Sequence, residues 1–254
     1  MMQGNFNKYL SLAAEVYDLD NPSLPVDAYN FYRHYLQNAQ EPILEPMCGT
    51  GRFLLTFLEE GFDIHGFDAS EYMLAALYAK AKARKLHIGN IWAGFAENLD
   101  RDERYGLIFI PSGSFGFVID DIAVKKTLKT FHQHLKEGGK LVLEVRTSHA
   151  VPPLGIWKGK RFRREDGKML IYSLCTALEG NIFVPFARFE LVDQHHVIQT
   201  EVEEFKVRIY EPEEMCELLK EVGFKNIRTV KAFYNNQDPE ENAKTIIYEA
   251  EKTD

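Results

Sequence analysis

The sequence is poor in several features that mark specialised classes of protein. It has three cysteines, Cys48, Cys175 and Cys216, which are far apart and odd in number, so we expect no disulfide framework and a reducing, cytoplasmic environment. No apolar run approaches the roughly 18–20 residues needed to span a bilayer. The first residues lack a basic segment followed by an apolar one, so we expect no signal peptide and no membrane partner.

Basic residues are also fewer than acidic residues. The chain has 30 Lys and Arg residues against 38 Asp and Glu residues, for a formal net charge of −8. Because affinity for nucleic acid comes largely from contacts between basic side chains and phosphates, this balance disfavours a nucleic-acid partner. One basic stretch, residues 158–164, stands out. It is either a solvated hairpin edge or a contact for an anionic group of a substrate.

Alternating strands and helices dominate what is present. Short apolar runs at 42–45, 62–68, 88–92, 105–111 and 140–145 are separated by helical patterns at 53–58, 70–78 and 120–136. A helix from Glu211 and two strands, at 224–230 and 243–250, follow later. Continuously apolar strands that alternate with helices are typical of a parallel sheet covered on both faces. We therefore predict a doubly wound α/β fold with a mostly parallel, seven-stranded Rossmann-like sheet.

Residues 150–210 interrupt this alternation. Extended segments at about 160–165, 168–178, 181–192 and 195–210 follow one another, with turn residues at 166–167, 180–181 and 193–194. This pattern predicts an antiparallel β insertion. The predicted organisation is a core of residues 1–149 and 211–254, whose first 40 residues are helical, with residues 150–210 inserted.

The most informative segment joins the first strand to the first helix. It reads Glu45-Pro-Met-Cys-Gly49-Thr-Gly51-Arg52. Two glycines allow a tight turn and close approach of a ligand to the backbone. The helix N-terminus that follows offers unpaired N–H groups. Asp68, at the end of the next strand, can accept hydrogen bonds from both hydroxyls of a ribose.

The loop differs from a dinucleotide site in two respects. A dinucleotide fingerprint has a third glycine three residues after the second, where this chain has Leu54. The carboxylate of Glu45 would oppose a pyrophosphate but suits a cation. The sequence therefore favours a nucleoside with positive charge and no phosphate, and disfavours a nicotinamide oxidoreductase.

This segment resembles motif I of class I S-adenosylmethionine-dependent methyltransferases. Further parts of the chain are similar to the family's later motifs: Gly66-Phe-Asp-Ala-Ser70 with Met73-Leu74, Ala96-Glu97, Ile110-Pro-Ser-Gly-Ser-Phe115, Leu135-Lys-Glu-Gly-Gly-Lys-Leu141 and the helix 211–224. The resemblance covers nearly all of the chain outside residues 150–210. It implies S-adenosyl-L-methionine as the cofactor.

The resemblance also implies a role for each matching residue. Gly49 and Gly51 would face the methionine part of the cofactor, Glu45 its ammonium group and Asp68 its ribose. Ala69 and Met73 would pack on the adenine, whose amine would meet Ala96-Glu97 through the Glu97 side chain or the adjacent backbone. Cys48 occupies a position where the family has a small residue. Arg52 either contacts the cofactor carboxylate or lies on the helix surface. Pro111 and Ser112 would line the passage to the substrate.

Three residues are candidates at the reacting end: Tyr17, Ser112 and His149. Tyr17 matches a position that often closes over the cofactor in this family, and His149 follows the fifth strand, at the sheet edge where ligands bind. The sequence Ile110-Pro-Ser-Gly113 differs from the Asn-Pro-Pro-Tyr stretch of enzymes that methylate bases of nucleic acids. The insertion resembles that of glycine and amino-sugar N-methyltransferases, where it caps the substrate pocket.

We therefore expect an enzyme that methylates a small-molecule amine or hydroxyl, without a metal, as a monomer or homodimer. Two alternatives stay open: a protein that binds the cofactor without turnover, in a regulatory or interaction role, and a methyltransferase that acts on protein or RNA.

Overall fold

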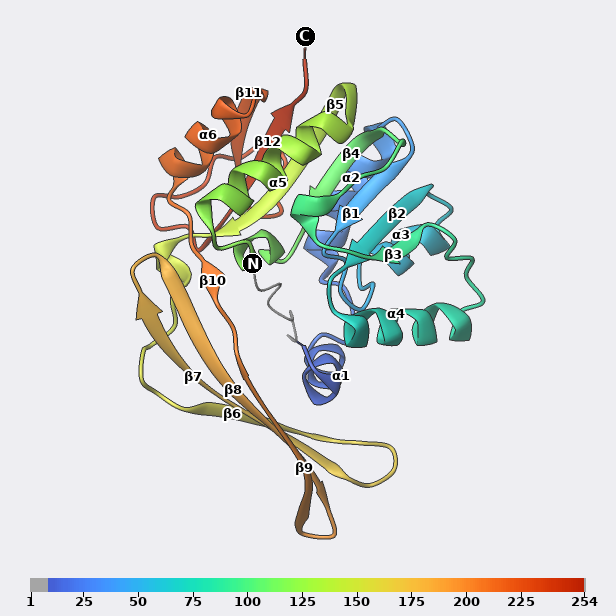
Figure 1. Cartoon of the computed structure of the whole chain (residues 1–254), viewed down its shortest axis with the longest axis vertical. Coiled ribbons are helices and arrows are strands. Elements are labelled where there is room, and N and C mark those ends of the chain that lie inside the picture. The colour runs from blue at the N-terminus through green and yellow to red at the C-terminus, as the bar shows by residue number, and fades with distance from the viewer. Residues whose placement is uncertain (1–8, 254) are drawn as a thin grey trace.

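The computed structural model describes residues 9–253, which form two sheets and the helices around them (Figure 1). The first sheet contains β1 (Ile43–Pro46), β2 (Ile64–Asp68), β3 (Ile91–Ala93), β4 (Tyr105–Ile110), β5 (Leu135–Arg146), β11 (Lys225–Lys231) and β12 (Thr245–Glu251). The second contains β6 (Lys158–Arg163), β7 (Met169–Glu179), β8 (Ile182–Asp193), β9 (His196–Glu204) and β10 (Val207–Arg208).

The helices of the described chain are short to medium in length. They are α1 (Ser11–Asp20), α2 (Val26–Asn38), α3 (Leu54–Glu59), α4 (Glu71–Ala83), α5 (Asp121–His134) and α6 (Pro212–Glu221), with single 3₁₀ turns η1 (Ala96–Asn98), η2 (Ser114–Phe117) and η3 (Ser148–Ala150). Within residues 9–253, none of these helices has the length and apolar character needed to cross a membrane.

The first sheet has the strand order β11-β12-β5-β4-β1-β2-β3. Strands β1 to β5 run parallel, whereas β12 is antiparallel to both β5 and β11. The predicted mostly parallel, seven-stranded sheet is therefore confirmed. The chain passes from β1 outward to β3 and then returns to β4 on the other side of β1. Doubly wound sheets bind ligands at the carboxyl ends of strands next to such a reversal.

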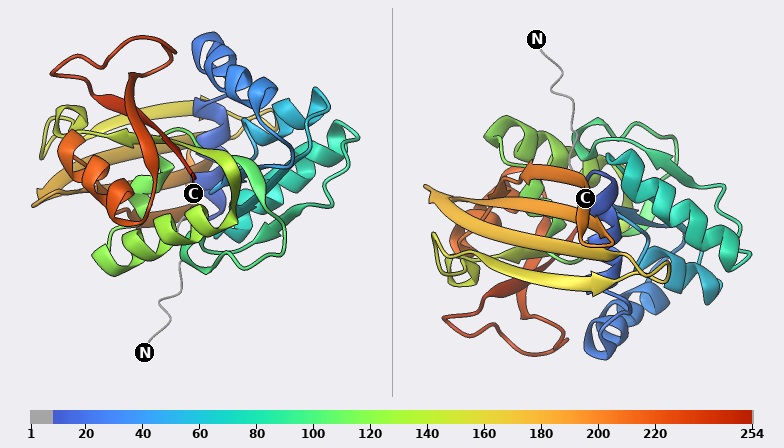
Figure 2. Two further views of the ribbon diagram at one scale, coloured as in Figure 1. Left: turned by 90° about the horizontal axis from the view of Figure 1, so that it is seen from above. Right: turned by 90° about the horizontal axis from the view of Figure 1, so that it is seen from below.

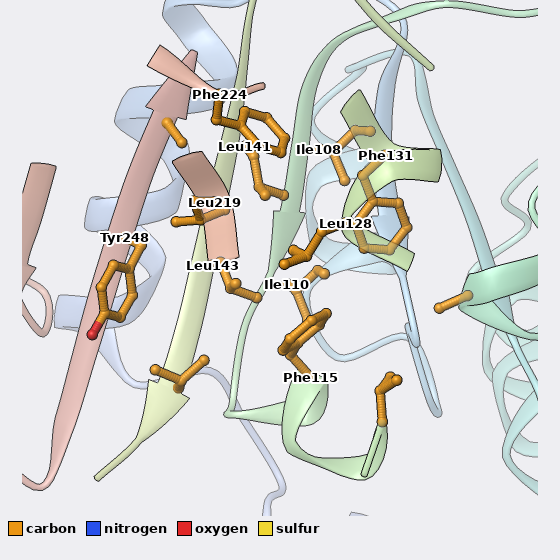
Figure 3. Packing of buried hydrophobic residues seen from close by; sticks show 14 of the residues in the cluster. Ile108, Ile110, Phe115, Leu128, Phe131, Leu141, Leu143, Leu219, Phe224 and Tyr248 are labelled. Carbon is orange, nitrogen blue, oxygen red and sulfur yellow. The ribbon is translucent and has the colours of Figure 1, made fainter. Parts of the chain in front are cut away.

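Helices cover both faces of this sheet, as its apolar strands require. In β4, Ile108 and Ile110 point to the face covered by α5 and α6, where they belong to the same buried cluster as Leu128 and Phe131 (Figure 3). The alternate residues Leu107 and Phe109 lie in the opposite cluster, with side chains of α2, α3 and α4. Burying each such side chain contributes about 1.5–3 kcal/mol, so the two layers hold the strand ends in fixed positions.

The second sheet is antiparallel, with the order β10-β8-β7-β6 and β9 paired to β8. The extended segment expected at 195–210 is divided into β9 and β10. Between them, the Phe205 N–H donates to the carbonyl of Pro185 in β8 at 2.8 Å. Proline has no N–H to return, so the ladder is interrupted at this point.

Helix α1 lies between the second sheet and the first (Figures 1 and 2). Its first N–H groups are bound by carboxylates of β9: Glu203 accepts from Tyr9 N at 2.6 Å and Leu10 N at 3.0 Å, and Glu201 accepts from Leu12 N at 2.8 Å. Negative charge at a helix N-terminus is favourable, so β9 stabilises the start of α1.

The other end of α1 contacts the loop that follows β1. The Thr50 hydroxyl donates to Asp18 at 2.5 Å, and Lys80 of α4 forms an ion pair with the same carboxylate at 2.8 Å. Helix α1 therefore connects the second sheet to the glycine-containing loop.

Candidate active site

The carboxylate of Asp68 holds the turn between β1 and α3. Its Oδ2 accepts a hydrogen bond from the Gly49 N–H, and its Oδ1 accepts one from the Ser70 N–H, both at 2.8 Å. Burial raises the pKa of Asp68, and these N–H donors oppose that rise by stabilising the charged form. Gly49 has a φ of +55°, a conformation that favours glycine. Asp68 thus organises the loop in addition to facing the cavity beside it.

A cavity of about 260 Å³ opens beside this turn, at the carboxyl ends of β1, β2, β3 and β4. Most residues that the sequence predicted for cofactor binding line it: Glu45, Cys48, Gly49, Arg52, Asp68, Ala69, Met73, Ala96, Glu97 and Pro111. Tyr17 and Ser112 line it as well. The structure therefore brings together residues from α1, four strand ends and α4.

Two of the predicted site residues lie elsewhere. Gly51 is buried below the turn, where an added Cβ would come within 2.8 Å of Leu55 and 2.9 Å of Leu77. Glycine is favoured there by the packing of α3 against α4 and by a φ of +78°. His149 is exposed in η3 and lines neither this cavity nor the second one described below.

Glu45 is a buried acid without a full set of partners. Its side chain is 2% exposed, it faces the cavity, and its Oε2 has no hydrogen-bond partner among the described residues. Burial raises its pKa well above the ordinary value, and the positive charge of Arg52 opposes that rise. An unsatisfied buried polar atom costs about 1–3 kcal/mol, more if charged, so this carboxylate is suited to a cationic ligand.

A second cavity, of about 720 Å³, adjoins the first. It lies between α1, the ends of β4 and β5, and aromatic side chains of the second sheet that include Tyr172, Phe183 and Phe189. The two cavities share a wall formed by Tyr9, Tyr17, Arg52, Phe53, Ser112, Ser114 and Phe117. A molecule in one cavity is therefore next to a molecule in the other.

Ser112 is fixed at this shared wall. It has a φ of +64°, its hydroxyl accepts from Arg52 at 2.7 Å, and its N–H donates to Glu144 Oε2 at 2.8 Å. A non-glycine residue in this conformation carries strain, which is often stored at functional sites. Arg52 in turn donates to Asn21 at 3.0 Å and lies 5.8 Å from the centre of the Tyr17 ring.

Comparison with known proteins agrees with this geometry. Residues 43–139, from β1 to the start of β5, match the family described as methyltransferase domain. An S-adenosylmethionine-dependent methyltransferase from Clostridium acetobutylicum has the same fold, with a TM-score of 0.78, 21% identity, and coverage of 95% of this chain and 98% of that one. The chain is a class I S-adenosylmethionine-dependent methyltransferase.

Two further relatives concern the type of acceptor. A sugar N-methyltransferase of Streptoalloteichus sp. superposes on the methyltransferase with a TM-score of 0.78 at 15% identity, covering 100% of this chain and 98% of that one. The glycine/sarcosine/dimethylglycine N-methyltransferase of Actinopolyspora halophila is 27% identical over 220 residues, which is 84% of this chain and 36% of that longer protein.

The residues of the first cavity fit the cofactor of this methyltransferase. S-Adenosylmethionine carries an ammonium group, a carboxylate and a ribose. The cavity offers the unpartnered Glu45 Oε2, a buried Arg52 Nε that also lacks a partner among residues 9–253, and the Asp68 carboxylate. The negative charge of Glu45 is thus suited to the ammonium group of the cofactor, and the positive charge of Arg52 is suited to its carboxylate.

Two other features of the sequence take a structural role in the methyltransferase. Burial raises the pKa of the Cys48 thiol well above its usual range, which opposes formation of a nucleophilic thiolate. In the basic stretch, Lys160 pairs with Asp20 at 2.5 Å and Arg164 with Glu15 at 3.2 Å. No residue of 158–164 lines the second cavity, and β6 is an exposed strand at the edge of the second sheet.

Several site residues were missed by the sequence analysis. Tyr9, Glu144, Arg146 and Phe117 line the cavities but match no motif. A signal did exist for Glu144, because it is the single charged residue in the apolar run Leu141-Val-Leu-Glu-Val145. Residues 1–8 of the predicted N-terminal helical segment lie outside the described residues.

Proposed function

We propose that the methyltransferase transfers a methyl group to a small molecule bound in the second cavity. In this proposal residues 1–149 and 211–254 hold the cofactor, and residues 150–210 cap the acceptor. The shared wall carries the proposal, because Tyr17, Arg52 and Ser112 face both cavities. A cavity of about 720 Å³ falls within the roughly 300–1,000 Å³ of small-molecule sites.

The cofactor would be held by residues of the first cavity. Asp68 would accept from the ribose hydroxyls, Glu45 would pair with the ammonium group, and Arg52 would donate to the carboxylate. Ala69 and Met73 would contact the adenine from one side, with Ala96 and Glu97 at its edge. When bound, the cofactor supplies an electrophilic methyl group on a sulfonium.

The protein's part in the reaction is to align the acceptor and exclude water. Holding two reactants in line can lower the barrier by up to about 7–11 kcal/mol. Tyr17 and Ser112 stand at the shared wall, where the acceptor atom and the methyl group would meet. Beyond the shared wall, aromatic side chains of the second sheet, Tyr172, Phe183 and Phe189, line the acceptor side of this cavity.

The charges of the second cavity indicate one feature of the acceptor. Arg146 and Lys244 line it and form no ion pair with any residue in 9–253. Asp20 also lines it but is paired with Lys160. Unpaired cations in a pocket favour a ligand with an acidic group. The relatives named as sugar and glycine N-methyltransferases support a small-molecule acceptor.

The proposal is tested by transfer of a labelled methyl group from S-adenosylmethionine to a broad panel of metabolites. We expect label in small molecules and none in added RNA or protein. Label in RNA or protein alone would show that the second cavity is not the acceptor site. Binding of S-adenosylhomocysteine with no transfer to any of these would favour the role without turnover.

A further inference from the structure

Glu144 is a buried carboxylate of β5 that contacts the second cavity. Its Oε2 accepts two hydrogen bonds, from the Tyr32 hydroxyl at 2.9 Å and from the Ser112 N–H at 2.8 Å. Its Oε1 accepts none from residues 9–253 and is not enclosed by the protein. One oxygen is therefore fixed from α2 and the loop after β4, while the other is left to the cavity.

A second tyrosine–glutamate pair in the same sheet shows what Glu144 lacks. Glu249 of β12 accepts from the Tyr35 hydroxyl and also forms an ion pair with Arg228 at 2.6 Å. Glu144 has the tyrosine but no cation within ion-pair distance among the described residues. Arg52 and Arg146 act on it only through space. A cation supplied by a ligand would complete its environment.

Other groups that could take a proton at the shared wall are less suitable. No histidine lines either cavity in residues 9–253. Burial raises the pKa of the Tyr17 phenol, so the phenolate is disfavoured at neutral pH. Asp20 is neutralised by Lys160 and does not reach the first cavity. Glu144 is thus the available carboxylate next to Ser112.

Building on the proposed function, we propose that Glu144 binds the acceptor as an ammonium ion and takes its proton, so that the acceptor is an amine and not an alcohol. The N–H bond breaks and its proton moves to the carboxylate, which leaves a lone pair on nitrogen. The nitrogen forms the new N–CH₃ bond while the S–CH₃ bond breaks, with its electron pair staying on sulfur. The product is a methylammonium ion, and Glu144 returns its proton to water.

The chemistry of a carboxylate explains this selectivity. Burial raises the pKa of Glu144, against the opposing effects of Ser112, Tyr32, Arg146 and Arg52. The difference between the pKa of Glu144 and that of an ammonium group, which is about 10, is therefore smaller than for an ordinary carboxylate. The gap to an alcohol remains too wide for efficient proton transfer, because general bases work best when the two pKa values are close.

The test compares matched acceptors and matched variants. Labelled methyl transfer is measured with glycine and glycolate, with alanine and lactate, which carry the acidic group that Arg146 and Lys244 favour, and with each acceptor from the metabolite panel beside its amine or hydroxyl counterpart. We expect label in the amines. In Glu144→Gln, turnover should fall by about 100-fold or more, as for loss of a general base. Glu144→Asp should recover part of it, and the control Glu249→Gln should keep the wild-type rate.

Two readouts do not depend on turnover. Glu144→Gln should bind S-adenosylhomocysteine like the wild type, since Glu144 does not line the first cavity. Its complex with S-adenosylhomocysteine should bind the amine at least about tenfold more weakly, the loss of one charge-assisted hydrogen bond. The rise of wild-type kcat/KM with pH through the carboxylate titration should disappear in this variant.

The outcomes separate this inference from the function on which it rests. Label in alcohols at rates similar to those in amines, or wild-type turnover and pH profile in Glu144→Gln, would overturn the role of Glu144 and leave a small-molecule methyltransferase. Absence of label from all small molecules would overturn the proposed function itself. Thermal melting of each variant separates loss of the proton acceptor from loss of the fold.

Discussion

Replacing Glu45 by glutamine should have opposite effects on stability and on cofactor binding. The wild-type carboxylate is 2% exposed and one of its oxygens has no partner in the described chain, so its charge opposes folding. Removing the charge should raise the unfolding free energy of the ligand-free protein at pH 7 by on the order of 1 kcal/mol. The same change should remove a charge-assisted bond of about 1.5–3 kcal/mol to the ligand ammonium, which weakens binding about 10- to 150-fold.

The pH dependence of stability gives a second measurement of the same group. Burial raises the pKa of Glu45, so the folded wild type binds more protons than the unfolded chain. Its unfolding free energy should therefore fall as the pH rises from the ordinary value of 4.5 through the raised folded pKa. In Glu45→Gln this contribution is absent, so the variant's advantage should vanish below the ordinary value. Urea denaturation of both proteins at several pH values measures this difference in unfolding free energy.

A ligand without an ammonium group provides the control for binding. S-Adenosylhomocysteine has the amino-acid part of the cofactor, whereas methylthioadenosine keeps only the nucleoside and a methylated sulfur. Calorimetry should show that Glu45→Gln lowers the affinity for S-adenosylhomocysteine and leaves the affinity for methylthioadenosine unchanged. Equal losses for both ligands would refute a contact between Glu45 and the ammonium and would indicate a distorted loop.

Three further changes test other parts of the site. Asp68→Ala should abolish S-adenosylhomocysteine binding as measured by calorimetry. It should also lower the unfolding free energy by about 1–3 kcal/mol, because the Asp68 carboxylate accepts hydrogen bonds from Gly49 and Ser70. A variant as stable as the wild type would contradict these hydrogen bonds. Gly51→Ala should lower the unfolding free energy measured by urea denaturation by about 1–3 kcal/mol more than Gly49→Ala does. A Cβ at Gly51 would contact two leucines, whereas a Cβ at Gly49 would have no atom within 4 Å. Equal losses in the two variants would refute this packing. Arg146→Ala should raise KM for the acceptor about tenfold without changing S-adenosylhomocysteine affinity, and an unchanged KM would remove Arg146 from acceptor binding.

The cofactor loop illustrates what local sequence can and cannot establish. The spacing of Glu45, the two glycines and Asp68 correctly placed them between β1, α3 and the end of β2. It could not distinguish the two glycines. Gly49 faces the cavity, whereas Gly51 supports the packing of α3 against α4, and only the positions of Leu55 and Leu77 reveal the difference.

The end of β5 shows the same limit for the candidate residues at the reacting end. His149 was a reasonable candidate because it follows a parallel strand, but the chain turns away at Thr147, whose hydroxyl donates to the Ala243 carbonyl at 2.6 Å. Glu144, five residues earlier, meets Tyr32 from α2 and Ser112 from the loop after β4. The contact with Tyr32 spans 112 positions in the sequence, and the contact with Ser112 spans 32 positions. No local sequence pattern reveals contacts over such separations.

Periodicity and turn residues were sufficient for the elements themselves, because strand and helix formation depend on neighbouring side chains and on glycine and proline at the ends. The succession of strands and helices along the chain, the antiparallel insertion and the cofactor motif follow from that local information, whereas the order of the strands within the sheet does not. The second cavity does not, because its walls come from α1, two ends of the first sheet and the second sheet, which meet only after the chain has folded. The proposed acceptor site is therefore a property of tertiary packing, while the proposed cofactor site is predictable largely from short sequence motifs.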